Sequence, residues 1–130
     1  MDTWTQITNI KQLVETTSDL SSDERDDYIS AMSCFEVVIR HMEAGGLHAE
    51  VGTALIWPYL VPKRIIMDIS NRRTLALVIL AHLSVLFHVF DHLWFMKGWS
   101  KQLLEDIVQC LPPSSDAWLD WPRKHIFGSV

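Results

Sequence analysis

Cysteine is scarce in this 130-residue chain, which contains only Cys34 and Cys110. The two lie far apart and form no Cys-x-x-Cys pair, so neither a zinc cluster nor a redox-active dithiol is expected. His88, Asp91 and His92 have the spacing of one helical face, but they lack the further ligands that a stable metal site needs. We therefore expect no bound metal ion.

Glycine is also scarce, and its five residues form no phosphate-binding loop. The pair Gly45-Gly46 is too short for such a loop and fits the end of a helix instead. A dinucleotide-binding fingerprint and a nucleophile elbow with a Ser-His-Asp order are absent as well. These absences disfavour nucleotide binding, redox-cofactor chemistry and classical hydrolase chemistry, and we expect no cofactor.

The chain has no excess of basic residues. Its eleven lysines and arginines are outnumbered by sixteen aspartates and glutamates, so the formal net charge is −5, and the basic residues are scattered. Contacts between cationic side chains and phosphates supply most of the affinity for nucleic acid. We therefore expect no direct DNA binding.

No hydrophobic run reaches the roughly 20 residues that a membrane-spanning helix needs. The longest run, 75–90, has 16 residues and contains His82, Ser84 and His88. Because polar groups are costly in hydrocarbon, a buried core helix explains this run better than a membrane span. The N-terminus has no basic segment followed by an apolar one, so no secretory signal is expected, and we predict an intracellular protein of the cytoplasm or nucleus.

Hydrophobic residues are abundant, at 48% of the chain, and recur at helical spacing. The length suits a single domain, 1–130. These features predict an all-α fold, a single orthogonal bundle of about six helices around a central buried helix.

Capping residues and helix breakers set the expected helix ends. Ser21 and Glu24 have capping-box spacing, and Pro62 suits the first residue of a helix. Asn71 resembles the N-cap of the central helix, and Ser115 resembles the cap of a last helix ending at Trp121. The expected helices cover 5–16, 21–45, 49–56, 63–70, 72–90, a segment from Gly98 to Leu111, and 115–121.

The segment 76–99, ALVILAHLSVLFHVFDHLWFMKGW, is the most informative motif. An Ala-Leu-x-Ile-Leu-Ala helix runs through His88 into a Trp-x-x-x-Gly-Trp turn, and Trp121-Pro122 follows about a helix later. With Trp57-Pro58 and Pro62, this pattern resembles the C-terminal effector domain of the fungal zinc-cluster (Zn2Cys6) transcription factors of the sterol uptake control type, over 22–127. The zinc-cluster DNA-binding domain is absent, so the chain is either a free-standing effector fold or a piece of a larger regulator.

The resemblance implies an all-helical domain that holds a sterol-like lipid. Large aromatic side chains suit flat polycyclic ligands and can stabilise a developing cation, although core packing is an equal explanation for them. Methionine would make such a pocket adaptable. The expected ligand-contacting residues are Trp57, Tyr59, Phe87, Trp94, Met96 and Trp99.

His82, His88 and Asp91 are the candidate catalytic residues. His88 and Asp91 share a helical face if the helix continues that far, whereas a structural role at the helix end is the alternative, which the resemblance favours for His88. His82 has only apolar neighbours. A buried imidazole needs a hydrogen-bond partner, which is either a protein group or a ligand hydroxyl or carbonyl.

Three functions fit these patterns. The first is the binding of a hydrophobic small molecule such as a sterol, terpenoid or polyketide. The second is a cofactor-free cyclase, isomerase or pericyclase, for example a Diels-Alderase, of a fungal natural-product pathway, because such catalysis needs mainly a shaped apolar cavity and one or two hydrogen-bond donors. The third is a helical dimerisation module that forms a homodimer through an apolar face.

Overall fold

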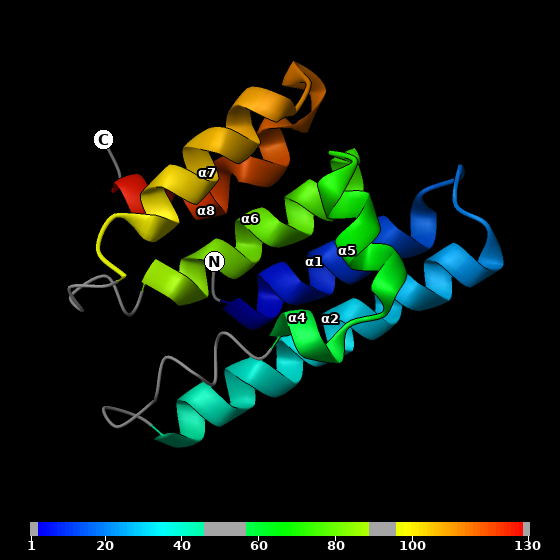
Figure 1. Cartoon of the computed structure of the whole chain (residues 1–130), viewed down its shortest axis with the longest axis horizontal. Coiled ribbons are helices and arrows are strands. Elements are labelled where there is room, and N and C mark those ends of the chain that lie inside the picture. Colours follow the sequence, from blue (N-terminus) through cyan, green and yellow to red (C-terminus); the bar gives the residue numbers. More distant parts are fainter. Residues whose placement is uncertain (1–2, 46–56, 89–95, 129–130) are drawn as a thin grey trace. The chain divides into compact units, whose positions relative to one another are not determined.

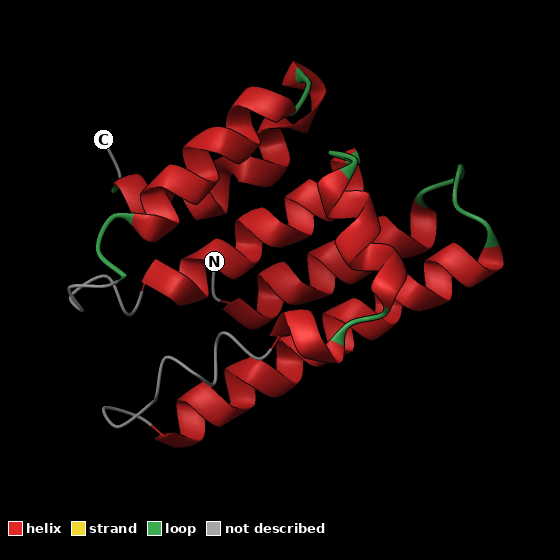
Figure 2. Ribbon diagram, viewed as in Figure 1, coloured by secondary structure: helices red, strands yellow, loops and turns green. Residues whose placement is uncertain are grey.

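The computed structural model describes residues 3–45, 57–88 and 96–128. These ranges form helices joined by short turns and contain no strand, so the predicted all-α helical fold is confirmed (Figure 1, Figure 2). The chain divides into two compact units, 1–71 and 72–130. The predicted helix 49–56 lies outside the described residues, and the assignment of the whole chain to a single domain stays a prediction.

The first unit is built on two long helices that pack against each other, α1 (Thr3–Thr16) and α2 (Ser22–Gly45). On α1, Ile7, Ile10 and Val14 recur every three or four residues and are buried, because this spacing places them on one face. The buried face of α2 follows the same rule and consists of Tyr28, Ala31, Met32, Phe35, Val38 and Ile39.

The turn between α1 and α2 confirms the predicted capping box. The backbone N–H of Glu24 donates to Ser21 Oγ at 3.1 Å, and the Ser21 N–H donates to the Glu24 carboxylate at 3.2 Å. The guanidinium of Arg25 donates to the carbonyls of Val14 and Thr17, at 3.3 and 2.6 Å. These bonds provide partners for backbone groups that both helix ends would otherwise leave unpaired.

Two short helices, α4 (Trp57–Leu60) and α5 (Lys63–Ser70), pack on α2. The bounds of α5 agree with the predicted helix 63–70, but Pro62 is its N-cap and not its first helical residue. Tyr28 Oη donates to the carboxylate of Asp68 at 2.7 Å, and Arg64 pairs with Asp27 at 2.7 Å. Both contacts join α5 to α2.

The second unit consists of α6 (Thr74–His88), α7 (Trp99–Cys110), the 3-10 helix η2 (Pro113–Ser115) and α8 (Asp116–Phe127). Helices α7 and α8 pack against each other and against α6. They run antiparallel, so α8 ends beside the start of α7 (Figure 1). Twelve residues of α6 are buried, as expected for a helix that is apolar on nearly all sides.

The start of α6 differs from the prediction. Asn71 does not cap this helix; it is the C-cap of α5, and its N–H donates to the Met67 carbonyl at 2.9 Å. Arg72 has a left-handed backbone with φ 58°, which stops α5, and α6 begins two residues later at Thr74. The predicted end at 90 lies outside the described residues.

The last helix extends beyond its predicted end at Trp121, because Pro122 lies inside α8. A proline within a helix costs about 3 kcal/mol, since it removes one backbone hydrogen bond and crowds the preceding turn. Burial of a large apolar side chain such as isoleucine contributes about 1.5 to 3 kcal/mol. Trp121 and Ile126, on either side of Pro122, are both buried, and together they offset that cost.

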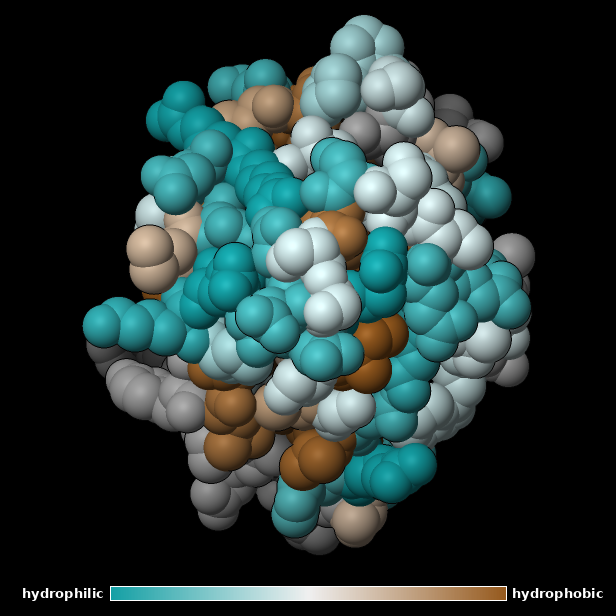
Figure 3. Space-filling model, turned by 90° about the vertical axis from the view of Figure 1, so that its right-hand side faces the viewer, coloured by the Kyte–Doolittle hydropathy of each residue, from teal (hydrophilic) through white to brown (hydrophobic). Residues whose placement is uncertain are grey.

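The surface offers no simple sign of a membrane span. No single helix in the described ranges is long and apolar enough to cross a bilayer. Helices α5 and α6 reach the necessary length and hydrophobicity only when taken together, and a break separates them. The face in Figure 3 is mainly hydrophilic, with hydrophobic side chains in separate patches. The large hydrophobic residues described as exposed are Val37, Leu60, Ile66, Met67, Trp99 and Phe127.

Candidate functional site

The imidazole of His82 is buried in α6, with 3% of the residue exposed. Its Nδ1 lies 2.9 Å from the carbonyl oxygen of Val78, one turn earlier. Because a carbonyl only accepts hydrogen bonds, Nδ1 carries the proton of the neutral ring and Nε2 presents a lone pair. No group among the described residues hydrogen-bonds to this buried Nε2.

The charge state of His82 follows from its surroundings. Burial lowers its pKa to about 4, and the hydrogen bond to the Val78 carbonyl opposes this only in part. The ring is therefore neutral near pH 7. It can accept a hydrogen bond at Nε2, and it adds no buried charge to an apolar environment.

Trp121 of α8 covers the ring of His82. The two rings are stacked, with centroids 5.6 Å apart and planes 12° from parallel. Trp121 also contacts His125, at a centroid distance of 4.4 Å, and the Nδ1 of His125 lies 3.0 Å from the Trp121 carbonyl oxygen. A flat aromatic face thus lies beside the only buried side-chain atom without a hydrogen-bond partner that is found in the described residues.

A second polar contact joins the end of α6 to the start of α7. His88 Nδ1 lies 2.9 Å from Oγ of Ser100, which is buried, whereas His88 is half-buried. Phe87 and Trp99 lie beside this pair in the sequence, and their rings meet at a centroid distance of 6.2 Å. The arrangement places a hydroxyl–imidazole pair next to an aromatic pair.

The two histidines of α6 serve different contacts. They are six residues apart, which corresponds to about 120° around the helix axis. His82 accordingly meets α8 through Trp121, and His88 meets α7 through Ser100. The angular separation therefore places the two imidazoles against different helices.

The remaining predicted site residues are distributed as follows. Met96 is buried in the second unit, whereas Trp57 is buried in the first, where its Nε1 donates to the Ala31 carbonyl at 3.2 Å. Within the described ranges, no three His, Cys, Asp or Glu side chains are grouped as metal ligands. Asp91, Trp94 and the side chain of Tyr59 lie outside the described residues.

Ser100, Trp121 and His125 were not among the predicted site residues. For Trp121 a signal existed, because Trp121-Pro122 belongs to the motif that carries the family resemblance. Ser100 and His125 have no comparable sequence signal, since their roles depend on how α7 and α8 pack on α6 and on each other.

No protein-family model matches this chain, and no curated protein or solved structure is significantly similar to it. The resemblance to the zinc-cluster regulators therefore stays a prediction. Among the chain's own described residues, His82 with Trp121 is the most specific chemical feature.

Proposed function

We propose that the protein binds a hydrophobic small molecule that carries a hydroxyl group, such as a sterol or a hydroxylated terpenoid or polyketide. The observation that carries this proposal is the buried Nε2 of His82, for which no described residue supplies a hydrogen bond. A buried polar atom left unpaired costs about 1 to 3 kcal/mol. A ligand hydroxyl that donates to Nε2 would remove this cost.

The surroundings of His82 favour an apolar ligand body over a polar one. The buried side chains of α6 are almost all aliphatic or aromatic, and the indole of Trp121 lies parallel to the imidazole. A rigid aromatic face suits a flat, fused-ring molecule, and burial of apolar ligand surface contributes about 25 cal/mol per Å². The neutral imidazole then orients the ligand through its hydroxyl.

A competition assay tests this proposal. The probe is the fluorescent sterol dehydroergosterol, detected by energy transfer from tryptophan, and the competitors are cholesterol and its methyl ether, which cannot donate a hydrogen bond. Cholesterol should compete better than the ether. The His82→Phe variant should bind the probe about tenfold more weakly, and it should no longer distinguish the two competitors.

The matched control is His41→Phe, which replaces an exposed histidine of α2 with the same residue. This variant should keep the affinity of the unmodified protein. Equal competition by the alcohol and its ether, or unchanged binding by His82→Phe, would contradict the proposal. Cooperative unfolding in urea would show that both variants are folded. Weaker probe binding by His82→Phe could then not be attributed to a loss of structure.

A cofactor-free cyclase, isomerase or pericyclase is a second candidate, which the His88–Ser100 pair supports. In the tautomer in which His88 Nδ1–H donates to Ser100 Oγ, the hydroxyl keeps its own proton and can donate it to a developing negative charge on a substrate carbonyl. With a linear polyene that carries a carbonyl-activated alkene as substrate, Ser100→Ala should lower kcat while leaving KM nearly unchanged. Equal product formation with and without the protein would exclude this candidate for that substrate.

A further inference from the structure

Two large aromatic side chains are exposed at the same end of the α7–α8 pair. Trp99 is the first residue of α7 and Phe127 the last of α8, and the antiparallel arrangement brings these helix ends together (Figure 1). Trp99 is 53% exposed and Phe127 is 43% exposed. Exposed aromatic residues at one place are unusual on a surface that has no partner.

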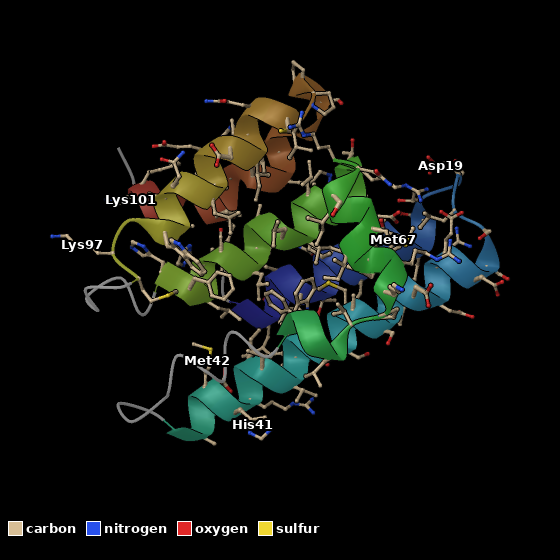
Figure 4. The ribbon with its side chains drawn as sticks, viewed as in Figure 1. Asp19, His41, Met42, Met67, Lys97 and Lys101 are labelled. Atoms are coloured by element: carbon tan, nitrogen blue, oxygen red, sulfur yellow. The ribbon has the colours of Figure 1, made fainter. Side chains whose placement is uncertain are left out.

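The same end is cationic. The segments 96–104 and 121–128 contain four basic residues and no aspartate or glutamate, although the whole chain has a net charge of −5. Figure 4 shows Lys97 and Lys101 at the start of α7. We call the two segments the basic aromatic end; its charged residues are Lys97, Lys101, Arg123 and Lys124.

The carboxylates of this helix pair lie elsewhere. Glu105 and Asp106 are exposed in the second half of α7, and Asp120 is exposed in the first half of α8. Glu105 lies four residues after Lys101, and Asp120 lies three residues before Arg123, so about one helical turn separates the carboxylates from the basic residues. The pair therefore has a cationic, aromatic end and an acidic remainder, and an anionic surface would attract the first and repel the second.

We propose that the basic aromatic end docks onto an anionic lipid surface. Tryptophan is favoured at the boundary between water and lipid, because its ring is apolar and its indole N–H remains hydrogen-bonded. Lysine side chains extend along an apolar surface while their ammonium groups stay beside lipid phosphates. Within the second unit, the exposed carboxylates Glu105, Asp106 and Asp120 turn the rest of the α7–α8 pair away from the membrane. The inference does not depend on the ligand proposed for His82.

Co-sedimentation with vesicles tests the role of charge. The full chain should bind vesicles of phosphatidylcholine mixed with phosphatidylserine, and it should bind pure phosphatidylcholine much less. Each basic residue near such a surface is worth about fivefold in affinity, so Lys97→Gln/Lys101→Gln should bind roughly 30-fold more weakly. The control Arg40→Gln/Lys63→Gln removes the same charge from exposed residues of the first unit and should bind like the unmodified protein.

A second pair of variants tests the aromatic contact. Trp99→Ala should weaken binding to the anionic vesicles several-fold, whereas Met67→Ala, at an equally exposed residue of α5, should not. Equal binding to both vesicle types, or equal losses in the two charge variants, would overturn the proposal. A third outcome would also overturn it: the protein does not bind vesicles, and sedimentation equilibrium shows a concentration-dependent dimer that Trp99→Ala abolishes. The basic aromatic end would then contact a second copy of the chain.

Discussion

The imidazole of His82 can become charged only at the expense of the folded state. It is buried, its Nδ1 is committed to the Val78 carbonyl, and no described residue offers a carboxylate to stabilise a second proton. An imidazolium in such surroundings carries a desolvation cost that water removes in the unfolded chain. This single residue therefore links the stability of the protein to pH.

The free energy of unfolding should fall as the pH is lowered from about 6.5 to about 4. The unfolded chain takes up a proton near the ordinary histidine pKa of 6.5, whereas the folded protein keeps His82 neutral down to about 4. The unfolded state thus binds more protons in this window. The contribution of His82 is complete above about pH 6.5, and up to about 3 kcal/mol of it is lost at the acidic end.

Urea unfolding at about pH 7 and about pH 4.5 measures this effect. His82→Phe should lose clearly less stability between the two conditions than the unmodified protein. His41→Phe, at an exposed position, should show the same loss as the unmodified protein. Identical pH dependence in all three proteins would show that His82 is not buried in its neutral form.

Part of the His82 site could be predicted from the sequence. The apolar neighbours of His82 indicated burial, and a protein group was one of the two hydrogen-bond partners expected for its ring. The stacking of Trp121 on His82 was not predictable, because it depends on the register in which α8 packs against α6. Contacts between residues about 40 positions apart leave no local pattern in a single sequence.

Helix ends differ in how much of their stability is local. The capping box at Ser21 and Glu24 uses groups within four residues of each other, and it forms as predicted. The start of the central helix after Asn71 and the end of the last helix at Trp121 were mispredicted, because a left-handed Arg72 and the burial of Trp121 and Ile126 decide them. Local hydrogen bonds can be inferred from spacing, whereas tertiary packing can override a helix breaker.

Removal of the Ser21 hydroxyl should destabilise the first unit. In Ser21→Ala the N–H of Glu24 loses its acceptor at the start of α2, which should lower the free energy of unfolding by about 1 kcal/mol. Chemical denaturation followed by circular dichroism measures the change. Ser33→Ala, at an exposed position in the middle of α2, should leave stability unchanged or raise it slightly, because alanine is the better helix former.

The two serine variants together test whether the capping hydrogen bond of Ser21 stabilises the first unit. Equal losses of stability in both variants would mean that a general effect of serine replacement, and not the capping hydrogen bond, determines the result. A loss in Ser33→Ala alone would contradict the assignment of Ser21 as the cap.

In the whole molecule, acidic residues outnumber basic ones, and the basic residues are unevenly distributed along the sequence. Sixteen acidic residues outweigh eleven basic ones, yet four of the basic residues fall in the basic aromatic end. A duplex-binding protein needs a row of cations that matches the spacing of the phosphates along the helix. One short cationic end suits a flat anionic surface better than a groove.

The protein should therefore bind anionic vesicles but not duplex DNA. In fluorescence anisotropy at about 150 mM salt, a labelled random duplex should show no micromolar binding, because the net charge of −5 repels the phosphates. The same sample should still bind vesicles that contain phosphatidylserine. Micromolar duplex binding that weakens in Lys97→Gln/Lys101→Gln would instead make the basic aromatic end a nucleic-acid contact.

The pairing of helices that are near neighbours in the sequence has a consequence for how quickly the chain acquires its structure. In the first unit α1 packs on α2, and in the second α6 packs on α7 and α7 on α8, whereas the contact of α8 with α6 joins more distant residues such as His82 and Trp121. Contacts between adjacent helices require the closure of only short loops, so the entropic barrier to forming them is small. During synthesis, all helices of the first unit have left the ribosome before the last residues of α8 are made, so the earliest contacts can form without waiting for the end of the chain.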